Sequence, residues 1–142
     1  MFAGQLALVT AAIFTGAALY VSFVEHPARL ALDDRAMLAE WKPAYKRGFA
    51  MQASLAILGF LLGVWAWYET GRGLWLAGAL VLLANWPYTL IFIMPTNTRL
   101  LATPLAAANA ETRALIRNWA ALHAVRTTLG AAATMLFLLA AI

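Results

Sequence analysis

The stretch WAALHAVRTTLG, from Trp119 to Gly130, decides how this chain folds. Its Trp119, His123, Arg126 and Gly130 follow one another at spacings of four, three and four residues, which places them on one face of a helix. The sequence then continues to Ile142 without another charge. Because arginine and histidine are costly this close to an apolar span unless they face a partner or a water-filled cavity, the stretch predicts a helix whose polar face meets other polar groups.

The composition indicates a membrane protein. Of the 142 residues, 64% are hydrophobic and 11% are charged, whereas soluble domains carry roughly 25% charged residues. The net charge of +4 does not indicate nucleic-acid binding, because basic residues of membrane proteins gather on the cytoplasmic side and set topology. The length favours a single domain, residues 1–142. The absence of cysteine excludes disulfides, a thiolate nucleophile and cysteine-ligated metals.

Four apolar segments are long enough to cross a bilayer, at about residues 5–24, 49–67, 74–94 and 119–141. A signal peptide is a weaker interpretation of the first segment, since no Lys or Arg precedes it and no cleavage motif follows it. We therefore expect an all-α membrane protein, a four-transmembrane-helix bundle. Residues 33–41, with two aspartates at their start and Trp41 at their end, predict a short interfacial helix between spans one and two.

Small residues and a proline predict how the spans pack. Gly59 and Gly63 form a GxxxG face on the second span, and Ala12 with Gly16 forms a similar pair on the first. Pro87 lacks an amide hydrogen and lies near the middle of the third span, so a kink is expected there.

The basic residues predict an orientation. Eight Lys and Arg residues lie in the polar stretches 25–47 and 95–117, against only Arg72 on the opposite side. The positive-inside rule therefore places these stretches in the cytoplasm and both termini on the non-cytoplasmic side. Arg113 and Arg117, four residues apart, are interpreted as a solvated or lipid-facing charged surface.

This topology brings polar groups from all four spans to the cytoplasmic end of the bundle, which is where a site in the mouth of a bundle would form. A histidine can accept a proton near neutral pH, and an arginine can stabilise developing negative charge. The candidate catalytic residues are Glu25, His26, His123 and Arg126, and the candidate substrate-binding residues are Trp41, Gln52, Asn85, Tyr88, Asn97 and Trp119.

A metal site is an open alternative. His26, His123 and Glu25 carry ligand atoms that suit zinc, copper or iron. No single helix has these residues at a metal-binding spacing, so the set would have to form through tertiary contacts. We predict no cofactor, and a metal at these three residues or a haem is the alternative.

Structural roles are the other alternative for several candidates. Arg126 would reach back to lipid headgroups, and Glu25 would pair with Arg126 or Arg29 without taking part in chemistry. Asn85 would satisfy backbone groups that Pro87 leaves unpaired.

Five short strings, taken in order along nearly the whole chain, resemble one membrane family. They are VEHPAR at 24–29, WKPAY at 41–45, NWPYT at 85–89, MPTN at 94–97 and WAALHAVRT at 119–127. Together they are similar to the domain-of-unknown-function family that includes the anthrone oxygenases, and the third string resembles its bacterial branch. The resemblance implies a small four-span protein, and similar proteins of fungal and bacterial pathways convert an anthrone to an anthraquinone with O₂ and without an added cofactor. We expect this protein in the bacterial inner (plasma) membrane.

The resemblance also implies roles for particular residues. The family's elements fall on Glu25, His26, Asn97, Trp119, His123 and Arg126. A histidine base would deprotonate C10 of the anthrone, and the anion would react directly with O₂ while Arg126 or Asn97 stabilises the oxyanion.

The leading hypothesis is therefore an oxygenase acting on a hydrophobic aromatic substrate in a cytoplasmic-end pocket. Its partners are the lipid bilayer and a hydrophobic small molecule, and a homo-oligomer is left open. The alternatives are a non-catalytic binding or transport module for a lipophilic molecule, and a structural subunit of a membrane complex.

Overall fold

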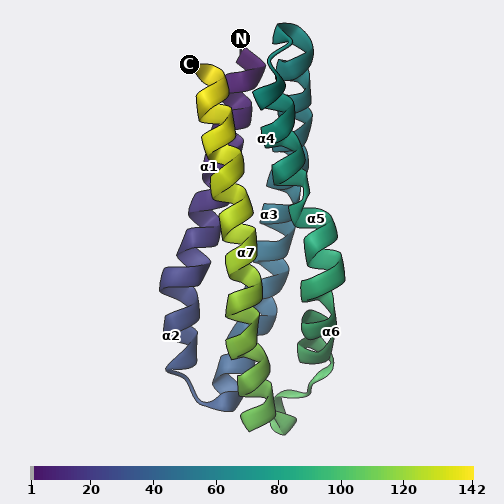
Figure 1. Ribbon diagram of the computed structural model, residues 1–142. Helices are drawn as coiled ribbons and strands as arrows, with labels where there is room; N and C mark the ends of the chain where they lie inside the picture. The colour runs from purple at the N-terminus through teal and green to yellow at the C-terminus, as the bar shows by residue number, and fades with distance from the viewer. Residues whose placement is uncertain (1) are drawn as a thin grey trace.

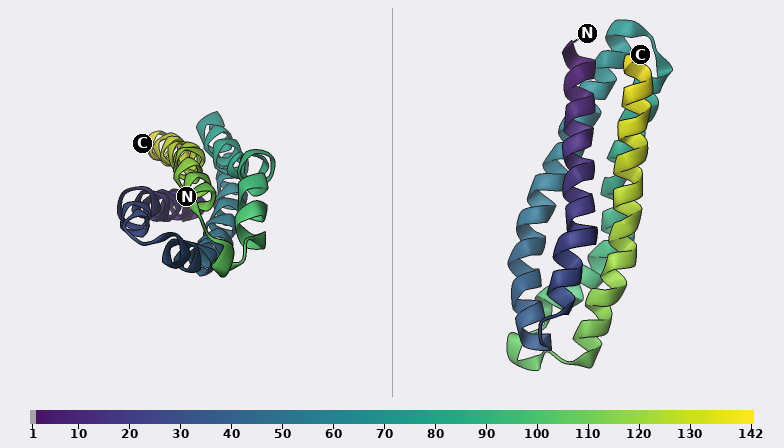
Figure 2. Two further views of the ribbon diagram at one scale, coloured as in Figure 1. Left: turned by 90° about the horizontal axis from the view of Figure 1, so that it is seen from below. Right: turned by 90° about the vertical axis from the view of Figure 1, so that its left-hand side faces the viewer.

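Residues 2–142 are described by a computed structural model, and they are almost entirely helical. The helices run side by side, with both termini and the α3–α4 turn at one end and α2, α6 and the connecting loops at the other (Figure 1 and Figure 2). The elements are α1 (Phe2–Tyr20), the π-helix η1 (Val21–Glu25), α2 (His26–Leu30), α3 (Asp34–Thr70), α4 (Gly73–Leu83), α5 (Asn85–Tyr88), the π-helix η2 (Thr89–Ile93), α6 (Met94–Ala102), the 3₁₀ turn η3 (Leu105–Ala107) and α7 (Ala110–Ala141).

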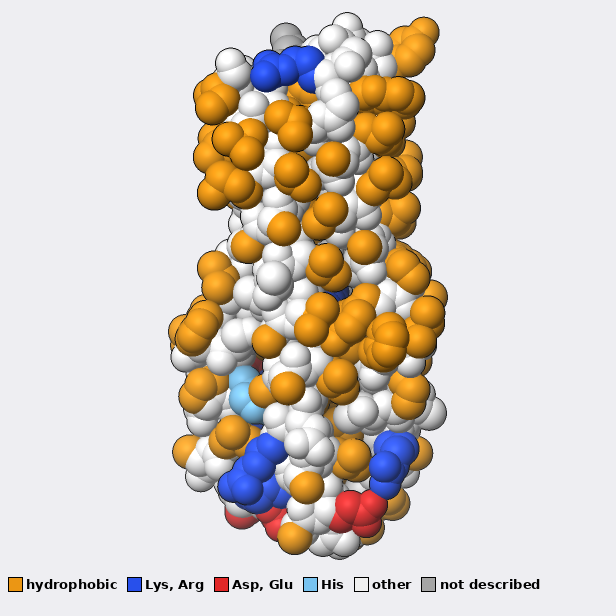
Figure 3. Space-filling view, viewed as in Figure 1, with side chains coloured by type: hydrophobic (Ala, Val, Ile, Leu, Met, Phe, Trp, Pro, Cys, Tyr) orange, Lys and Arg blue, Asp and Glu red, His pale blue; other side chains and the backbone are white. Residues whose placement is uncertain are grey.

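Residues 2–142 contain four helical segments long and apolar enough to span a membrane, as the sequence predicts: Phe2–Leu30, Asp34–Thr70, Gly73–Ala102 and Ala110–Ala141. Each is longer than its predicted span, because the helices continue past the apolar core into polar ends. On the face in Figure 3, hydrophobic side chains cover the middle and upper part, while acidic side chains and most basic ones gather at the lower end. We call this the charged end.

The expected interfacial helix at residues 33–41 is not a separate element. The helix α3 begins at Asp34 and continues through Pro43 to Thr70 without a break. The side chain of Asp33 caps it by accepting a hydrogen bond of 2.9 Å from the amide of Ala36. Pro43 and the residue four positions earlier both lie on the exposed side, so the carbonyl that Pro43 leaves without a donor faces outward.

The kink expected in the third span is confirmed, and it lies slightly earlier than Pro87. The helix α4 ends at Leu83, Ala84 forms a turn, and α5 begins at Asn85. The amide Nδ2 of Asn85 donates a hydrogen bond of 3.0 Å to the carbonyl of Leu82, so this side chain partly repairs the break. The π-helix η2 follows at once. Such segments are rare and occur frequently at functional sites.

Close packing between the spans occurs on the predicted glycine face of α3. Gly59 and Gly63 are both buried, and a Cβ at Gly63 would lie 2.8 Å from the ring of Phe137. Ala12 and Gly16, which have a similar spacing, instead lie on the exposed side of α1. Within residues 2–142, therefore, the pair Gly59 and Gly63 permits close helix contact, whereas Ala12 and Gly16 face outward.

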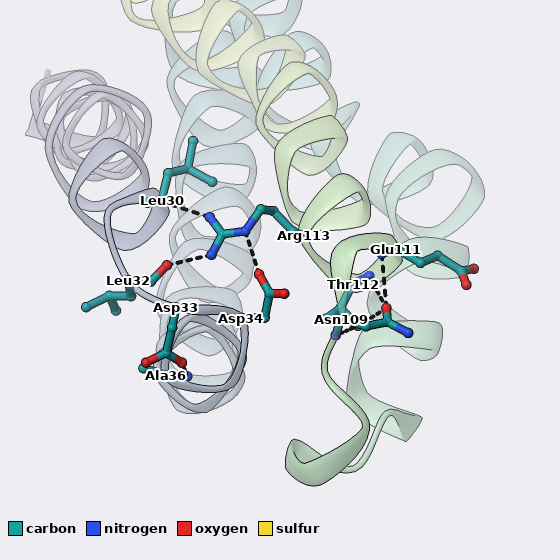
Figure 4. Close-up of polar contacts among 9 residues, drawn as sticks. All are labelled: Leu30, Leu32, Asp33, Asp34, Ala36, Asn109, Glu111, Thr112 and Arg113. Carbon is teal, nitrogen blue, oxygen red and sulfur yellow. Dashed lines mark hydrogen bonds and ion pairs between the residues drawn. The ribbon is translucent and has the colours of Figure 1, made fainter.

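At the charged end, Arg113 ties α7 to the connection between the first two spans (Figure 4). Its guanidinium donates to the carbonyls of Leu30 (3.0 Å) and Leu32 (2.6 Å) and pairs with Asp34 at 2.5 Å. The interpretation of Arg113 as part of a free charged surface is therefore wrong, since the loop supplies it with carbonyl partners. Arg117 does lie exposed.

Candidate functional site

The polar face of α7 is buried, as its spacing predicts. The buried residues of this helix recur at spacings of four and three along its whole length, which is the pattern of a helix packed in a left-handed bundle. Trp119, His123 and Arg126 belong to this series and expose 6%, 2% and 6% of their surface. His123 and Arg126 therefore face the interior of the bundle.

A pocket lies beside these three residues, and we call it the His123 pocket. It encloses about 330 Å³ including the space at its mouth. Its lining comes from the first, second and fourth spans: Val21, Glu25, Arg29, Trp41, Ala44, Tyr45, Gly48, Phe49, Gln52, Trp119, His123 and Arg126.

The imidazole of His123 is oriented by its neighbours. Its Nδ1 lies 3.3 Å from the hydroxyl of Ser22, which also lies 3.3 Å from the hydroxyl of Thr127. Its ring stacks on Trp119 with 4.8 Å between the ring centroids. Within residues 2–142 no hydrogen bond is made to the other ring nitrogen, Nε2, so this atom is available for a proton transfer.

Ser22 was not predicted, and the reason is physical. It lies in the π-helix η1, where the extra residue per turn shifts the helix register. A regular helical period applied to the sequence does not give that shift.

Arg126 is a buried cation without an acidic partner among the described residues. Its guanidinium lies 5.7 Å from the centroid of the Phe14 ring, and its Nε has no hydrogen-bond partner in the described part of the chain. The four ion pairs within residues 2–142 all involve other arginines. A buried guanidinium in this state strongly favours an anionic or oxygen-bearing ligand.

The partner of Glu25 is Arg29, which is one of the two partners that the sequence left open. Arg29 is only 2% exposed and forms ion pairs with both Glu25 and Glu40. Its guanidinium also lies 5.9 Å from the centroid of the Trp119 ring. Arg29 lines the His123 pocket but was not predicted as a site residue; its spacing of four residues from Glu25 was the available signal.

Aromatic rings form one wall of the pocket. Trp41 is fully buried, stacks on Tyr45 at 4.9 Å and meets Trp119 edge-on at 6.3 Å. Asn97 fixes the orientation of Trp119, because its Oδ1 accepts a 3.0 Å hydrogen bond from the indole Nε1. His26 stacks on Trp119 at 6.2 Å but does not line the pocket.

The remaining predicted residues divide between two locations. Gln52 lines the His123 pocket, and its buried Oε1 has no hydrogen-bond partner within residues 2–142. Asn85 lies in a second pocket, which also borders Arg126. Tyr88 lines neither pocket. Its hydroxyl donates a 3.0 Å hydrogen bond to the carbonyl of Leu122.

The possible metal ligands do not come together. Within residues 2–142 there is no group of three His, Cys, Asp or Glu side chains close enough to hold a metal ion. His26 packs against Trp119, and the carboxylate of Glu25 is engaged by Arg29. The donor set His26, His123 and Glu25 therefore does not fit a metal site as the residues are arranged here.

The geometry combines three chemical capacities in one pocket: an imidazole nitrogen that can take a proton, a guanidinium that can stabilise an oxyanion, and flat aromatic walls. These are the elements required for proton abstraction from an aromatic ligand that becomes an anion.

Comparison with known proteins gives two kinds of similarity. The family described as anthrone oxygenase matches residues 41–136. The anthrone oxygenase tpcL of Aspergillus fumigatus is 32% identical over 131 residues, which cover 85% of this chain and 81% of the relative. An anthrone oxygenase of Claviceps purpurea is 29% identical over 139 residues, covering 87% of this chain and 79% of the relative. No solved structure matches the chain.

Proposed function

Because the chain belongs to the anthrone oxygenase family, we propose that it oxidises a flat, hydrophobic anthrone with O₂ in the His123 pocket. The observation that carries the proposal is the presence, on one pocket, of an oriented histidine with an unbonded Nε2 and a buried guanidinium with no acidic partner within residues 2–142. The names of the relatives support the class of substrate.

The proposed reaction converts the CH₂ group at C10 of the anthrone and one O₂ into a carbonyl group and one water. His123 takes the first C10 proton through Nε2, and the electron pair left on the ligand delocalises onto its oxygen. O₂ then adds at C10, forming a C–O bond, and the resulting peroxide anion takes up a proton. Loss of the second C10 proton breaks the O–O bond and releases water, so the carbon is oxidised by four electrons and O₂ is reduced by four.

The other residues have supporting roles in this proposal. Arg126 stabilises the negative charge on the ligand oxygen once C10 has lost its proton. Trp41 and Trp119 provide flat surfaces against the aromatic ligand, and Asn97 holds Trp119 in place. Arg29 holds Glu25 at the rim of the pocket.

We further propose that the charged end faces the cytoplasm of a bacterium, in its inner membrane, with both termini on the other side. The excess of Lys and Arg in residues 25–47 and 95–117 supports this orientation.

The proposal is tested by replacing His123 with Gln and measuring O₂ consumption and anthraquinone formation from anthrone in detergent-solubilised protein. Loss of a general base costs about 10²–10⁴-fold in rate, while binding of the product anthraquinone should change little. The matched variant is His26→Gln, which alters a buried histidine outside the pocket and should retain most of the turnover.

Wild-type turnover by His123→Gln would contradict the assignment of the base. Binding of anthraquinone by wild-type protein without any detectable oxidation would instead favour the non-catalytic binding or transport module.

A further inference from the structure

A second pocket lies on the other side of Arg126, between α3 and the broken part of the third span, and we call it the Trp86 pocket. It encloses about 250 Å³ including its mouth. It shares Phe49 and Arg126 with the His123 pocket, so the two are adjacent. Its lining is Phe49, Ala53, Ala56, Asn85, Trp86, Thr89, Leu90 and Arg126.

The Trp86 pocket adjoins an open groove on the outer surface of α3. The groove encloses about 800 Å³ of space open to the surroundings and shares Ala53 and Trp86 with the pocket. The half-buried indole of Trp86 stands at this boundary, and its Nε1 donates a 3.2 Å hydrogen bond to the carbonyl of Ala53. The groove is lined by Ala50, Ala53, Ser54, Ile57, Leu58, Leu61 and Trp86.

The backbone around Trp86 is the least regular part of any span. The helix breaks at Ala84, resumes for four residues and passes into the π-helix η2 at Thr89. An interrupted hydrogen-bond ladder of this kind marks a place where a helix can bend, whereas an uninterrupted helix resists bending. Movement of Trp86 away from α3 would break its hydrogen bond to Ala53 but would disrupt little regular helical structure.

Two buried polar atoms in the Trp86 pocket have no partner within residues 2–142. They are Oδ1 of Asn85 and the hydroxyl of Thr89, on side chains that are 2% and 3% exposed. By contrast, the hydroxyls of Thr10, Thr15, Thr128 and Thr134 each donate to the carbonyl four residues earlier. Unpaired buried polar atoms are costly, so this pair favours a ligand hydroxyl, which can donate to Oδ1 of Asn85 and accept from the hydroxyl of Thr89.

We propose that the Trp86 pocket is a lateral entrance to the site, through which a flat aromatic ligand bearing a hydroxyl group passes from the bilayer to Arg126. Trp86 covers this entrance, and Asn85 with Thr89 binds the hydroxyl group of the bound ligand at its inner end. The aromatic identity of this ligand rests on the proposed function. The route itself rests on the shared linings, the helix break and the unpaired polar atoms.

The natural absence of cysteine allows a direct test by reversible blocking. Leu90 lines the pocket and is 52% exposed, so Leu90→Cys can be converted to a mixed disulfide with 2,2′-dithiodipyridine in detergent. We expect this to slow association of 1,8-dihydroxyanthraquinone at least fivefold and dithiothreitol to restore the rate. The control is Met135→Cys, which is 54% exposed on α7 and lines neither pocket. An unchanged association rate after complete blocking of Leu90→Cys would overturn the entrance.

The polar contact is tested by Thr89→Val, which removes the hydroxyl at nearly constant volume. The variant should bind 1,8-dihydroxyanthraquinone about fivefold more weakly, as expected for one lost hydrogen bond, and bind unsubstituted anthraquinone as the wild type does. Thr128→Val, on the exposed side of α7, should change neither affinity. Equal effects of Thr89→Val on both quinones would contradict the contact.

These readouts are binding measurements, so they separate the two proposals. If both binding tests give the expected result but the protein never oxidises anthrone, the entrance is supported and the proposed function is refuted. Turnover of anthrone without those effects would refute the entrance alone, and a wild-type protein that binds neither quinone would overturn both.

Discussion

Two buried arginines illustrate what the residue scale contributes. Arg29 is neutralised by two carboxylates, whereas Arg126 has no acidic partner within residues 2–142. The sequence predicted that Arg126 would be buried, since its spacing from Trp119 and His123 places it on the packed face of a helix. It could not predict which arginine would form an ion pair with Glu25, because that pairing depends on distances between side chains in the folded bundle.

The two arginines should respond oppositely to replacement by Met. Arg29→Met leaves two partly exposed carboxylates without their cation and should lower the free energy of unfolding by about 2 kcal/mol. Arg126→Met removes a buried charge that no acidic side chain within residues 2–142 balances, so stability should be unchanged or higher while affinity for an anionic ligand falls. Unfolding in mixed micelles by a titration with SDS measures the first effect. A loss of stability in Arg126→Met equal to that in Arg29→Met would contradict this assignment.

At the scale of elements, regular periodicity was predictable and irregularity was not. The buried face of α7 and the glycine face of α3 follow from the helical repeat and from residue size. The two π-helices η1 and η2 do not follow from the helical repeat, because a local shift of helix register does not change the amino-acid composition of the segment. The length of α3 was also missed, since Pro43 resembles the end of a helix but lies on the exposed side of this one.

The importance of the glycine face is tested by adding one methyl group. Gly63→Ala would place a Cβ 2.8 Å from Phe137 and 2.9 Å from Ala79, and overpacking of this kind costs about 1–3 kcal/mol of stability. Gly16→Ala meets nothing within 4 Å on the exposed side of α1, so its better helix propensity should raise stability by up to about 1 kcal/mol. Thermal unfolding in detergent compares the two variants, and a Gly63→Ala protein as stable as the wild type would contradict the close packing.

The whole molecule is asymmetric along its long axis. One end carries nearly all the charges, and Arg113 links its helices. The other end is stabilised by a core of alanines and of aromatic residues such as Trp75 and Phe137. The His123 pocket is built from residues nearer the charged end, on three spans. The sequence predicted that polar groups would gather there, because in a four-span bundle the ends of spans one and three lie on the same side as the starts of spans two and four. The Trp86 pocket was beyond such reasoning, since it depends on the exact place of the helix break.

The orientation of this asymmetric molecule can be measured with single cysteines in the cysteine-free chain. Ala107 is exposed at the charged end, and Gly73 lies at the opposite end with open space around it. Because the basic residues should remain in the cytoplasm, a membrane-impermeant maleimide applied to bacterial spheroplasts should label Gly73→Cys at once. It should label Ala107→Cys only after the membrane is permeabilised. The reverse pattern would place the charged end outside, and the His123 pocket would then lie nearer the non-cytoplasmic surface.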